Sequence, residues 1–284
     1  MINKNLARSI ALTYLTLVPL LTIALGLGVG YISYKIYLPV WLVNVVLMVL
    51  SVNTLGGGKA IRSAHKEQKH LFACACCFII PTLLTSMFFG LGAPPYESPQ
   101  TWVQTITEQR VRYYFLLAAG LFVAIGFGLL SRHLKKTGEE FYTVIGSVAM
   151  QIAAPVFLLD MSFWGFFLTR LYQQLVNTHT DKTPEWVLPL RIQFYYVNIL
   201  AAALVYLATA AFALSLKRAR WFKPAACNIY LVVCGFLFVL DILPPTLPEP
   251  FATLNFIVSI PAVPFMVVYF MGINLVSVAA KQHQ

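Results

Sequence analysis

Long apolar runs with almost no charged residues recur along the whole of this 284-residue sequence. A run of about 18 or more apolar residues is typical of a helix that crosses the hydrocarbon core of a bilayer. Only 11% of the residues are charged, whereas about 25% are charged in a typical soluble domain. The runs also lack the apolar–polar alternation of membrane β-strands. The sequence therefore predicts an all-α polytopic membrane protein.

We expect a bundle of about eight transmembrane helices and no soluble domain. The two longest connections, 93–112 and 170–191, are too short to form a domain of their own. The apolar stretch near the N-terminus runs on too far for a signal peptide and is interpreted as the first span. Residues 1–284 are thus predicted to form one transmembrane domain. The expected spans are 10–33, 36–55, 71–91, 113–131, 142–168, 192–216, 225–243 and 251–278.

Lysine and arginine are distributed unequally between the two sets of loops. With eight spans, 14 of them lie on the side of both termini and 6 on the other side. Because basic loops tend to stay in the cytoplasm, both termini are predicted to be cytoplasmic, in a plasma membrane or a bacterial inner membrane. The net charge of +10 then reflects basic loops beside anionic lipid head groups. We expect no nucleic-acid partner.

Two motifs match functional signatures only in part. The stretch Gly56–Ser63, "GGGKAIRS", has Asn53 where a phosphate-binding loop needs its first glycine, and Ala60 where it needs Ser or Thr. We interpret its glycines as the end of the second helix, where the chain needs a positive φ. The cysteines of Cys74–Cys77 have no histidine or acid nearby to complete a metal site, and we expect them to pack a helix end.

The sequence favours no cofactor. All five histidines lie outside the predicted spans, which argues against intramembrane haem or zinc ligation. No lysine lies in the middle of the last spans, where a retinal Schiff base would need one. The cofactor therefore stays unassigned, and we expect none. The histidines are His65, His70, His133, His179 and His283.

Asp160 is one of two acids inside the predicted spans, and it lies deep in the fifth. A charged side chain in the hydrocarbon is costly, so it usually faces the bundle interior or a wet cavity and has a partner. At about 100° per residue, Gly146, Ala149 and Ala153 share its helical stripe. Small residues at such positions are typical of helix packing. We therefore expect the Asp160 face to point inward.

Pro155 lies five residues before Asp160 and is predicted to kink the same span. It leaves the carbonyl of Gln151 without its usual in-helix donor. A proline-broken helix with a buried acid and a polar amide is typical of the discontinuous helices of transporters. Gln151 and Asp160 lie on opposite helix faces, however, which argues against one compact site.

Asp241 lies near the end of the seventh span, and we expect it to end its helix close to water. Arg112 and Arg191 begin the fourth and sixth spans on the same outer side. Either arginine is a candidate ion-pair partner for either aspartate.

Pro261 and Pro264 interrupt the eighth span, and Asn255 and Ser259 lie one turn apart outside this break. These polar groups either line an outward-facing cavity or form unrelated packing hydrogen bonds. The candidate intramembrane polar site comprises Asp160, Gln151, Pro155, Asp241, Arg112, Arg191, Asn255 and Ser259.

Two functional hypotheses remain open. The first is a small-solute or proton-coupled transporter with Asp160 as its ion or proton site. The second is a non-catalytic subunit or scaffold of a larger complex, whose partners besides the lipid bilayer are further copies of this chain or other membrane proteins. An intramembrane enzyme is less favoured, because Asp241 lacks the Gly-x-Gly that precedes the acid in aspartyl membrane proteases. Pigment or lipid binding is the last class.

Overall fold

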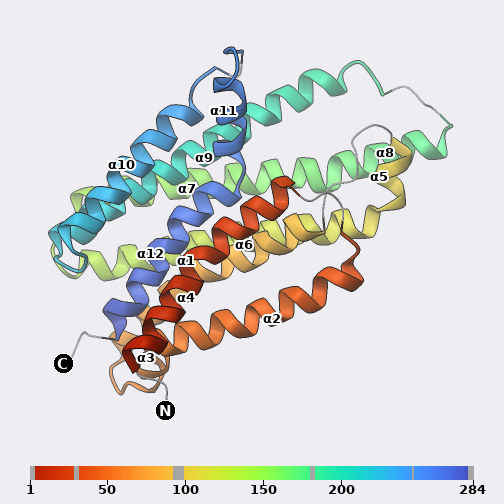
Figure 1. Ribbon diagram of the computed structural model, residues 1–284. Helices are drawn as coiled ribbons and strands as arrows, with labels where there is room; N and C mark the ends of the chain where they lie inside the picture. The colour runs from red at the N-terminus through yellow and green to blue at the C-terminus, as the bar shows by residue number, and fades with distance from the viewer. Residues whose placement is uncertain (1–3, 29–31, 92–98, 180–182, 245, 281–284) are drawn as a thin grey trace.

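Every element in the described residues of the computed structural model is a helix (Figure 1). The described residues are 4–28, 32–91, 99–179, 183–244 and 246–280. Two short π-helical segments, η1 and η2, continue the helices before them. The elements are α1 (Lys4–Gly28), α2 (Tyr34–Val52), η1 (Asn53–Gly57), α3 (Gly58–Arg62), α4 (Lys66–Gly90), α5 (Pro99–Gln104), α6 (Ile106–Lys135), α7 (Phe141–Ser162), η2 (Phe163–Phe167), α8 (Leu168–Asn177), α9 (Val187–Arg218), α10 (Pro224–Asp241), α11 (Phe251–Ser259) and α12 (Ala262–Ala279).

Eight helices in these ranges are long and apolar enough to cross a membrane, as the sequence predicts. Several extend beyond the predicted bounds, such as the fourth, which runs over Ile106–Lys135 instead of 113–131. Two others also differ in form. The fifth is longer, because α7, η2 and α8 make one stretch from Phe141 to Asn177. The eighth is divided, because extended residue Ile260 (φ −61°, ψ 128°) separates α11 from α12. The predicted interruption is therefore confirmed at Pro261, whereas Pro264 lies inside the first turn of α12 and does not break it.

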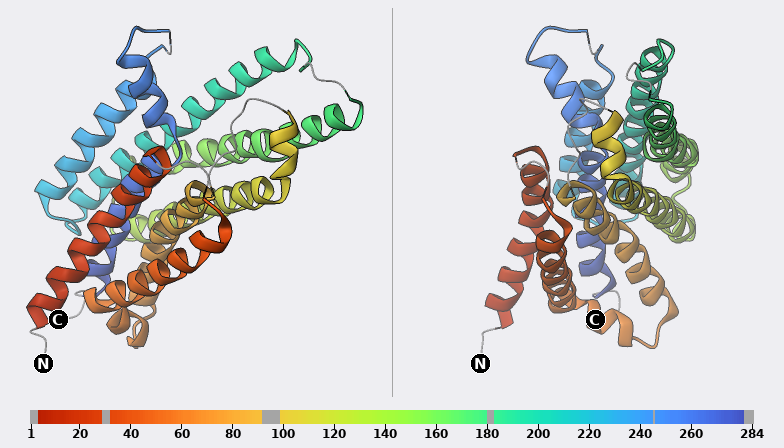
Figure 2. Two further views of the ribbon diagram at one scale, coloured as in Figure 1. Left: turned by 45° about the vertical axis from the view of Figure 1, so that its right-hand side comes forward. Right: turned by 90° about the vertical axis from the view of Figure 1, so that its right-hand side faces the viewer.

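The spans pack as a series of neighbours. Helix α4 lies against α6 and α12, α6 against α7, α7 against α9, and α9 against α10. Helices α9 and α12 are the most buried spans, whereas α1 and α2 are the least buried. Figures 1 and 2 show α1 and α2 along one edge of the bundle. Most of the surface of these two helices is therefore not covered by the rest of the described structure.

The ring of Phe78 fills the junction of α4, α6 and α12. A Cβ atom added at Gly126 would lie 2.5 Å from this ring, and one added at Gly272 would lie 2.8 Å from Phe78 Cβ. The Cys74 thiol, one turn earlier on α4, donates a hydrogen bond to the Gly126 carbonyl (3.2 Å). Glycines at such crossings let helix backbones approach closely. Cys74 therefore packs a helix contact, as expected.

A tyrosine supplies the hydrogen bond that a proline removes from α1. Pro19 has no N–H to donate to the Leu15 carbonyl four residues earlier. The Tyr269 hydroxyl of α12 donates to that carbonyl at 2.7 Å, and both side chains are fully buried. This bond ties the peripheral helix α1 to the most buried span.

Gly56 has a φ of +125°, and α2 gives way there to the short helix α3. This confirms the interpretation of the glycine-rich stretch as a helix end. A Cβ atom at Gly56 would also lie 2.4 Å from the Ala280 side chain. Glycine is therefore required both by the backbone conformation and by the close approach of the end of α12.

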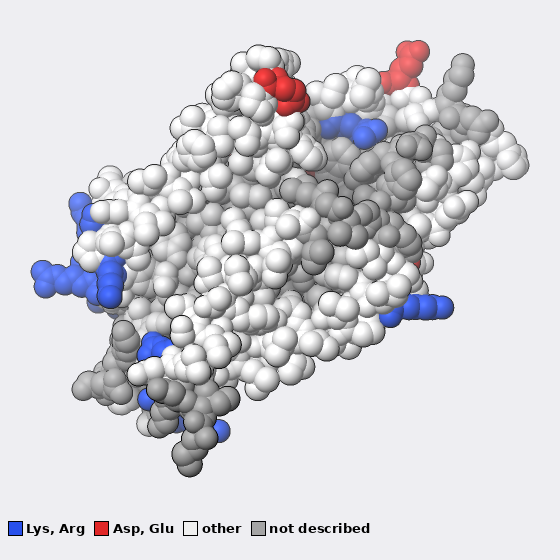
Figure 3. All heavy atoms as spheres, viewed as in Figure 1, with Lys and Arg blue, Asp and Glu red and all other residues white. Residues whose placement is uncertain are grey.

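Basic side chains gather at the end of the bundle where α1 begins and α12 ends (Figure 3). Both ion pairs found among the described residues lie there. Lys136 contacts Glu67 at 3.1 Å, and Arg218 contacts Glu139 at 3.7 Å. The side of the membrane that this end faces stays a prediction from the loop charges.

Candidate functional site

The carboxyl group of Asp241 is completely buried, although it belongs to the last residue of α10. The prediction that it ends its helix near water is wrong, because α11 covers the end of α10. The Asn255 amide of α11 donates to the backbone carbonyls of Leu240 (3.2 Å), Asp241 (2.6 Å) and Leu243 (3.1 Å). Asn255 therefore caps α10 and excludes water from the acid.

The break between α11 and α12 is held by α9. Where a helix stops, its last carbonyls lack in-helix donors. The Tyr206 hydroxyl donates to the Val258 carbonyl (2.7 Å), and the Asn198 amide donates to the Ser259 carbonyl (2.9 Å). The Tyr195 hydroxyl donates to Asn255 Oδ1 (2.8 Å). Three polar side chains of α9 thus fix the position of α11.

The hydroxyl groups around Asp241 already donate their hydrogens to other acceptors. Its carboxyl lies near the side chains of Ser259, Tyr195 and Tyr206 and near the backbone amide of Ala203, which forms no hydrogen bond to it. The two tyrosine hydroxyls donate to α11 as described above, and Ser259 donates to the Asn255 carbonyl (2.5 Å). Each hydroxyl has a single hydrogen. These groups therefore offer only oxygen lone pairs to Asp241.

Neither carboxyl oxygen of Asp241 has a hydrogen-bond partner in the described structure. A carboxylate anion here would be desolvated, without a cation, and at the negative end of the α10 dipole. A proton or a bound cation would remove this cost. The same oxygen lone pairs that repel an anion would accept a hydrogen bond from a protonated carboxyl.

Asp160 is also completely buried, and the inward face predicted for its helix is confirmed. Its Oδ1 atom accepts a hydrogen bond from the Trp164 indole N–H (2.9 Å), whereas Oδ2 has no partner in the described residues. The Arg191 guanidinium carbon lies 5.7 Å from the centre of the Trp164 ring. Trp164 therefore lies near both the acid and the arginine, and Arg191 forms no ion pair with Asp160 in the described residues.

The expected break at Pro155 is not found. Helix α7 runs unbroken from Phe141 to Ser162, because a proline removes only one in-helix hydrogen bond and the flanking turns persist. The helix instead widens into η2 just after Asp160. Gln151 is exposed on the outside of the bundle, away from the acid. The structure thus separates Gln151 and Pro155 from the other candidates.

Arg112 is bonded to neither Asp160 nor Asp241. Its Nε donates to the Phe88 carbonyl (2.8 Å), and its Nη1 donates to Gln109 Oε1 (2.6 Å). The guanidinium carbon also lies 4.2 Å from the centre of the Phe88 ring. Phe88 is in the last turn of α4, so the arginine satisfies a helix C-terminus.

The two buried acids do not form a catalytic pair. The hydrogen bond to Asp160 comes from Trp164, and the Asp241 oxygens have none, so the carboxyls share no hydrogen bond. This removes a paired-acid mechanism of the aspartyl-protease type. Within the described ranges, no three His, Cys, Asp or Glu side chains lie together as a metal site would require.

The structure brings Asp241, Asn255 and Ser259 together and adds residues that sequence reasoning missed. Tyr195, Asn198 and Tyr206 were not singled out. Their spacing places all three on one face of α9, and this pattern of polar residues in an apolar span was the available signal. We call Asp241, Asn255, Ser259, Tyr195, Asn198 and Tyr206 the α11 site.

Comparison with models of known protein families, with curated proteins and with solved structures finds no match to this chain.

Proposed function

We propose that this integral membrane protein is a proton-coupled transporter of a small solute, and that Asp241 carries the proton. One observation supports this most strongly. Asp241 is a fully buried carboxyl whose oxygens form no hydrogen bond and no ion pair within the described residues, beside a span that is broken at Ile260. Buried acids at broken helices are a common arrangement for ion coupling in transporters.

The physical basis is a difference between two states of the acid. A protonated Asp241 is neutral and donates to a neighbouring oxygen, so α11 can stay closed over it. Loss of the proton leaves an uncompensated buried charge, which favours a conformation where α11 moves and water reaches the acid. Helix α11 is held by a few hydrogen bonds, which involve Asn255, Tyr195 and Tyr206. Hydrogen bonds to water can replace these bonds when α11 moves.

We further propose that both termini are cytoplasmic, as the basic loops predict, in a plasma membrane or bacterial inner membrane. The end of α10 that carries Asp241 then faces the outside. The coupling proton and the solute would enter from that side when α11 opens.

The test uses proteoliposomes that contain a pH-sensitive dye, under an imposed inward proton gradient. Amino acids, sugars and short carboxylates are added one class at a time. For wild type, we expect one class to accelerate acidification of the lumen. Asp241→Asn should abolish that acceleration, because the amide cannot carry the proton. Glu185→Gln, which changes an exposed acid in the connection before α9, is the matched control and should behave like wild type.

Asp160→Asn is the second arm of this experiment. Asp160 already has a donor in Trp164, so we expect this variant to retain solute-dependent acidification. If Asp241→Asn transports like wild type and Asp160→Asn does not, the proton belongs to Asp160 and our assignment is wrong. If no solute class moves protons in wild type, coupled transport of these solutes is refuted.

The exposure of Gln151 favours a second candidate function, a subunit of a larger membrane complex. Its amide lies in a groove of about 370 Å³ between α6 and α7, with Ser131, Ser147 and Lys135, and makes no hydrogen bond in the described residues. An amide that faces hydrocarbon gains from a partner helix. Native mass spectrometry of the gently extracted protein tests this. A stoichiometric partner lost in Gln151→Leu would support the subunit function, and a monomer would contradict it.

A further inference from the structure

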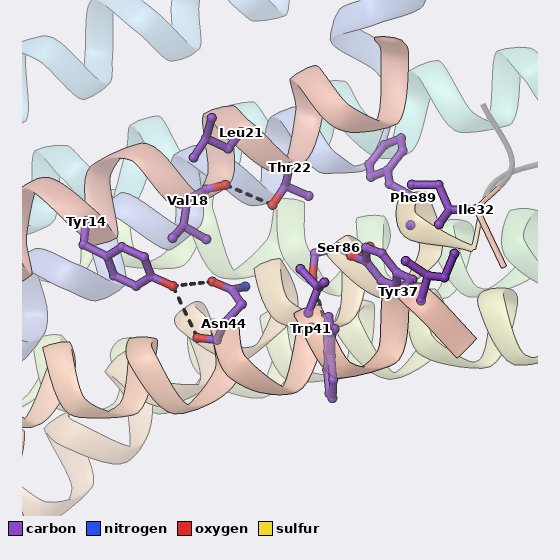
Figure 4. A pocket seen from close by; sticks show the side chains of 13 residues that line it. Tyr14, Val18, Leu21, Thr22, Ile32, Tyr37, Trp41, Asn44, Ser86 and Phe89 are labelled. Atoms are coloured by element: carbon purple, nitrogen blue, oxygen red, sulfur yellow. Dashed lines mark hydrogen bonds between the residues drawn. The ribbon is translucent and has the colours of Figure 1, made fainter. Parts of the chain in front are cut away.

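A second concave site lies between α1, α2 and α4, away from the helices that carry the α11 site (Figure 4). Its volume is about 380 Å³, within the range of about 300–1,000 Å³ that is typical of small-molecule sites. Neither α9, α10 nor α11 contributes to it, so it is independent of the proposed transport function. The lining residues are Tyr14, Val18, Leu21, Thr22, Ile32, Ile36, Tyr37, Val40, Trp41, Asn44, Ser86, Phe89 and Gly90.

The wall of this cavity is aromatic, and most of its polar hydrogens are already used. The Tyr37 hydroxyl donates to the Ser86 carbonyl (2.5 Å), and the Trp41 indole N–H donates to the Leu83 carbonyl (2.9 Å). The Thr22 hydroxyl donates within its own helix. A cavity with such a wall favours an apolar occupant with a flat body over water.

Asn44 differs from these residues because its side chain has polar hydrogens that form no hydrogen bond within the described residues. Its Oδ1 atom accepts a hydrogen bond from Tyr14 (2.5 Å), but its amide nitrogen donates to no acceptor in the described structure. Figure 4 shows this nitrogen on the side of Asn44 away from Tyr14, toward the part of the cavity lined by Trp41 and Ser86. The cavity therefore presents one unused donor inside an apolar wall.

The depth of Asn44 restricts what can accept this hydrogen bond. Asn44 lies ten residues into α2, about 15 Å along the helix axis and close to the middle of the bilayer. Phospholipid ester groups lie at the interface, about 15 Å away, and acyl chains at this depth have no acceptor. Water is scarce there. A molecule that dissolves in the hydrocarbon can bring an acceptor to this depth.

We propose that this cavity binds a lipid-soluble carbonyl compound with a flat apolar body, of the quinone class, whose carbonyl oxygen accepts the Asn44 amide hydrogen. The aromatic side chains of Tyr14, Tyr37, Trp41 and Phe89 suit a planar ring, and the apolar cavity between α1 and α2 suits a hydrocarbon tail. The unused donor selects the oxygen-bearing molecule over a plain hydrocarbon of the same shape.

The binding test uses the full chain in nanodiscs and two probes, decylubiquinone and the oxygen-free analogue decylbenzene. Quenching of tryptophan fluorescence reports quinone binding, and Trp41→Phe should remove most of the quenching. Decylbenzene binding is measured by its competition with the quinone. We expect decylbenzene to bind about tenfold more weakly, since it forms no hydrogen bond.

Two variants distinguish the effect of the Asn44 donor on binding from the effect of the packing between α1 and α2. Asn44→Leu should weaken quinone binding about tenfold and leave decylbenzene binding unchanged. Tyr14→Phe breaks the same Tyr14–Asn44 bond but keeps the amide and the aromatic ring, and it should keep the preference for the quinone over decylbenzene.

Three results would overturn the proposal. They are equal affinity of wild type for both probes, equal quinone affinity of wild type and Asn44→Leu, and the absence of binding. A fatty-acid methyl ester is the third ligand in the series. If it binds in an Asn44-dependent way and the quinone does not, the site takes a carbonyl compound of the fatty-ester class and the quinone assignment is wrong.

Discussion

Two contacts between helices in this bundle form at backbone carbonyl groups that lack an in-helix donor. Pro19 releases the Leu15 carbonyl, and Tyr269 binds it. The helix break at Ile260 releases the Val258 carbonyl, and Tyr206 binds it. A buried carbonyl without a donor is costly in a membrane interior. A polar side chain of another helix therefore donates a hydrogen bond to each of these two carbonyls. Tyrosine serves both positions because its hydroxyl stands at the end of a large apolar ring.

Tyr269→Phe should destabilise the protein by about 1–3 kcal/mol, because it leaves the Leu15 carbonyl without a donor. Pro19→Ala restores an N–H at the position that normally serves this carbonyl. In the Pro19→Ala background, Tyr269→Phe should therefore cost clearly less. Equilibrium unfolding of the four proteins in detergent gives the coupling free energy of this cycle. A cost of Tyr269→Phe that is equal in both backgrounds would contradict the role of Pro19.

At the scale of helices, glycine positions on α6 have different roles. Gly126 contacts the Phe78 ring, whereas a Cβ atom at Gly128 would meet nothing within 4 Å. Gly126→Ala should destabilise the junction of α4, α6 and α12 by about 1–3 kcal/mol through overpacking. Gly128→Ala should be neutral or stabilising by up to about 1 kcal/mol, because alanine has the higher helix propensity. Thermal unfolding of both variants checks this prediction. Equal changes in stability would show that the contact between Gly126 and Phe78 does not restrict the size of the side chain there.

The short helix α11 depends on α9 for its position. Tyr206→Phe should raise amide hydrogen exchange in residues 251–259 by about tenfold, because the Val258 carbonyl loses its donor. Tyr196→Phe is the matched control, since Tyr196 is exposed on the same helix and makes no hydrogen bond in the described structure. Unchanged exchange in Tyr206→Phe would mean that α11 is held by other contacts.

At the scale of the whole molecule, the basic loops predict the orientation in the membrane. Cysteine substitutions at exposed sites test it with a membrane-impermeant maleimide on intact cells. Glu249→Cys, in the connection before α11, should react from outside. Lys136→Cys, in the loop after α6, should react only after permeabilisation. The reverse pattern would invert the predicted topology and place Asp241 toward the cytoplasm.

Hydrophobic runs alone predicted the number of spans, and the inward stripe of Gly146, Ala149, Ala153 and Asp160 was also correct. Both are local properties, since helix length and periodicity follow from neighbouring residues. The two arginine partners were wrong for a non-local reason. Sequence places Arg112 and Arg191 on the outer side, but only packing decides that one caps α4 and the other lies over Trp164.

The sequence by itself determined an eight-span helical bundle, a helix end at Gly56 and a break at Pro261, because backbone conformation and burial in lipid are set residue by residue. Only the tertiary structure decided which of the two buried acids has no hydrogen bond to its carboxyl oxygens within the described residues. Asp241 lies at a helix end, where sequence reasoning expects water, and it is buried because α11 folds back over α10. Such long-range coverage depends on the packing of α9, α10 and α11 together, and no local pattern encodes it.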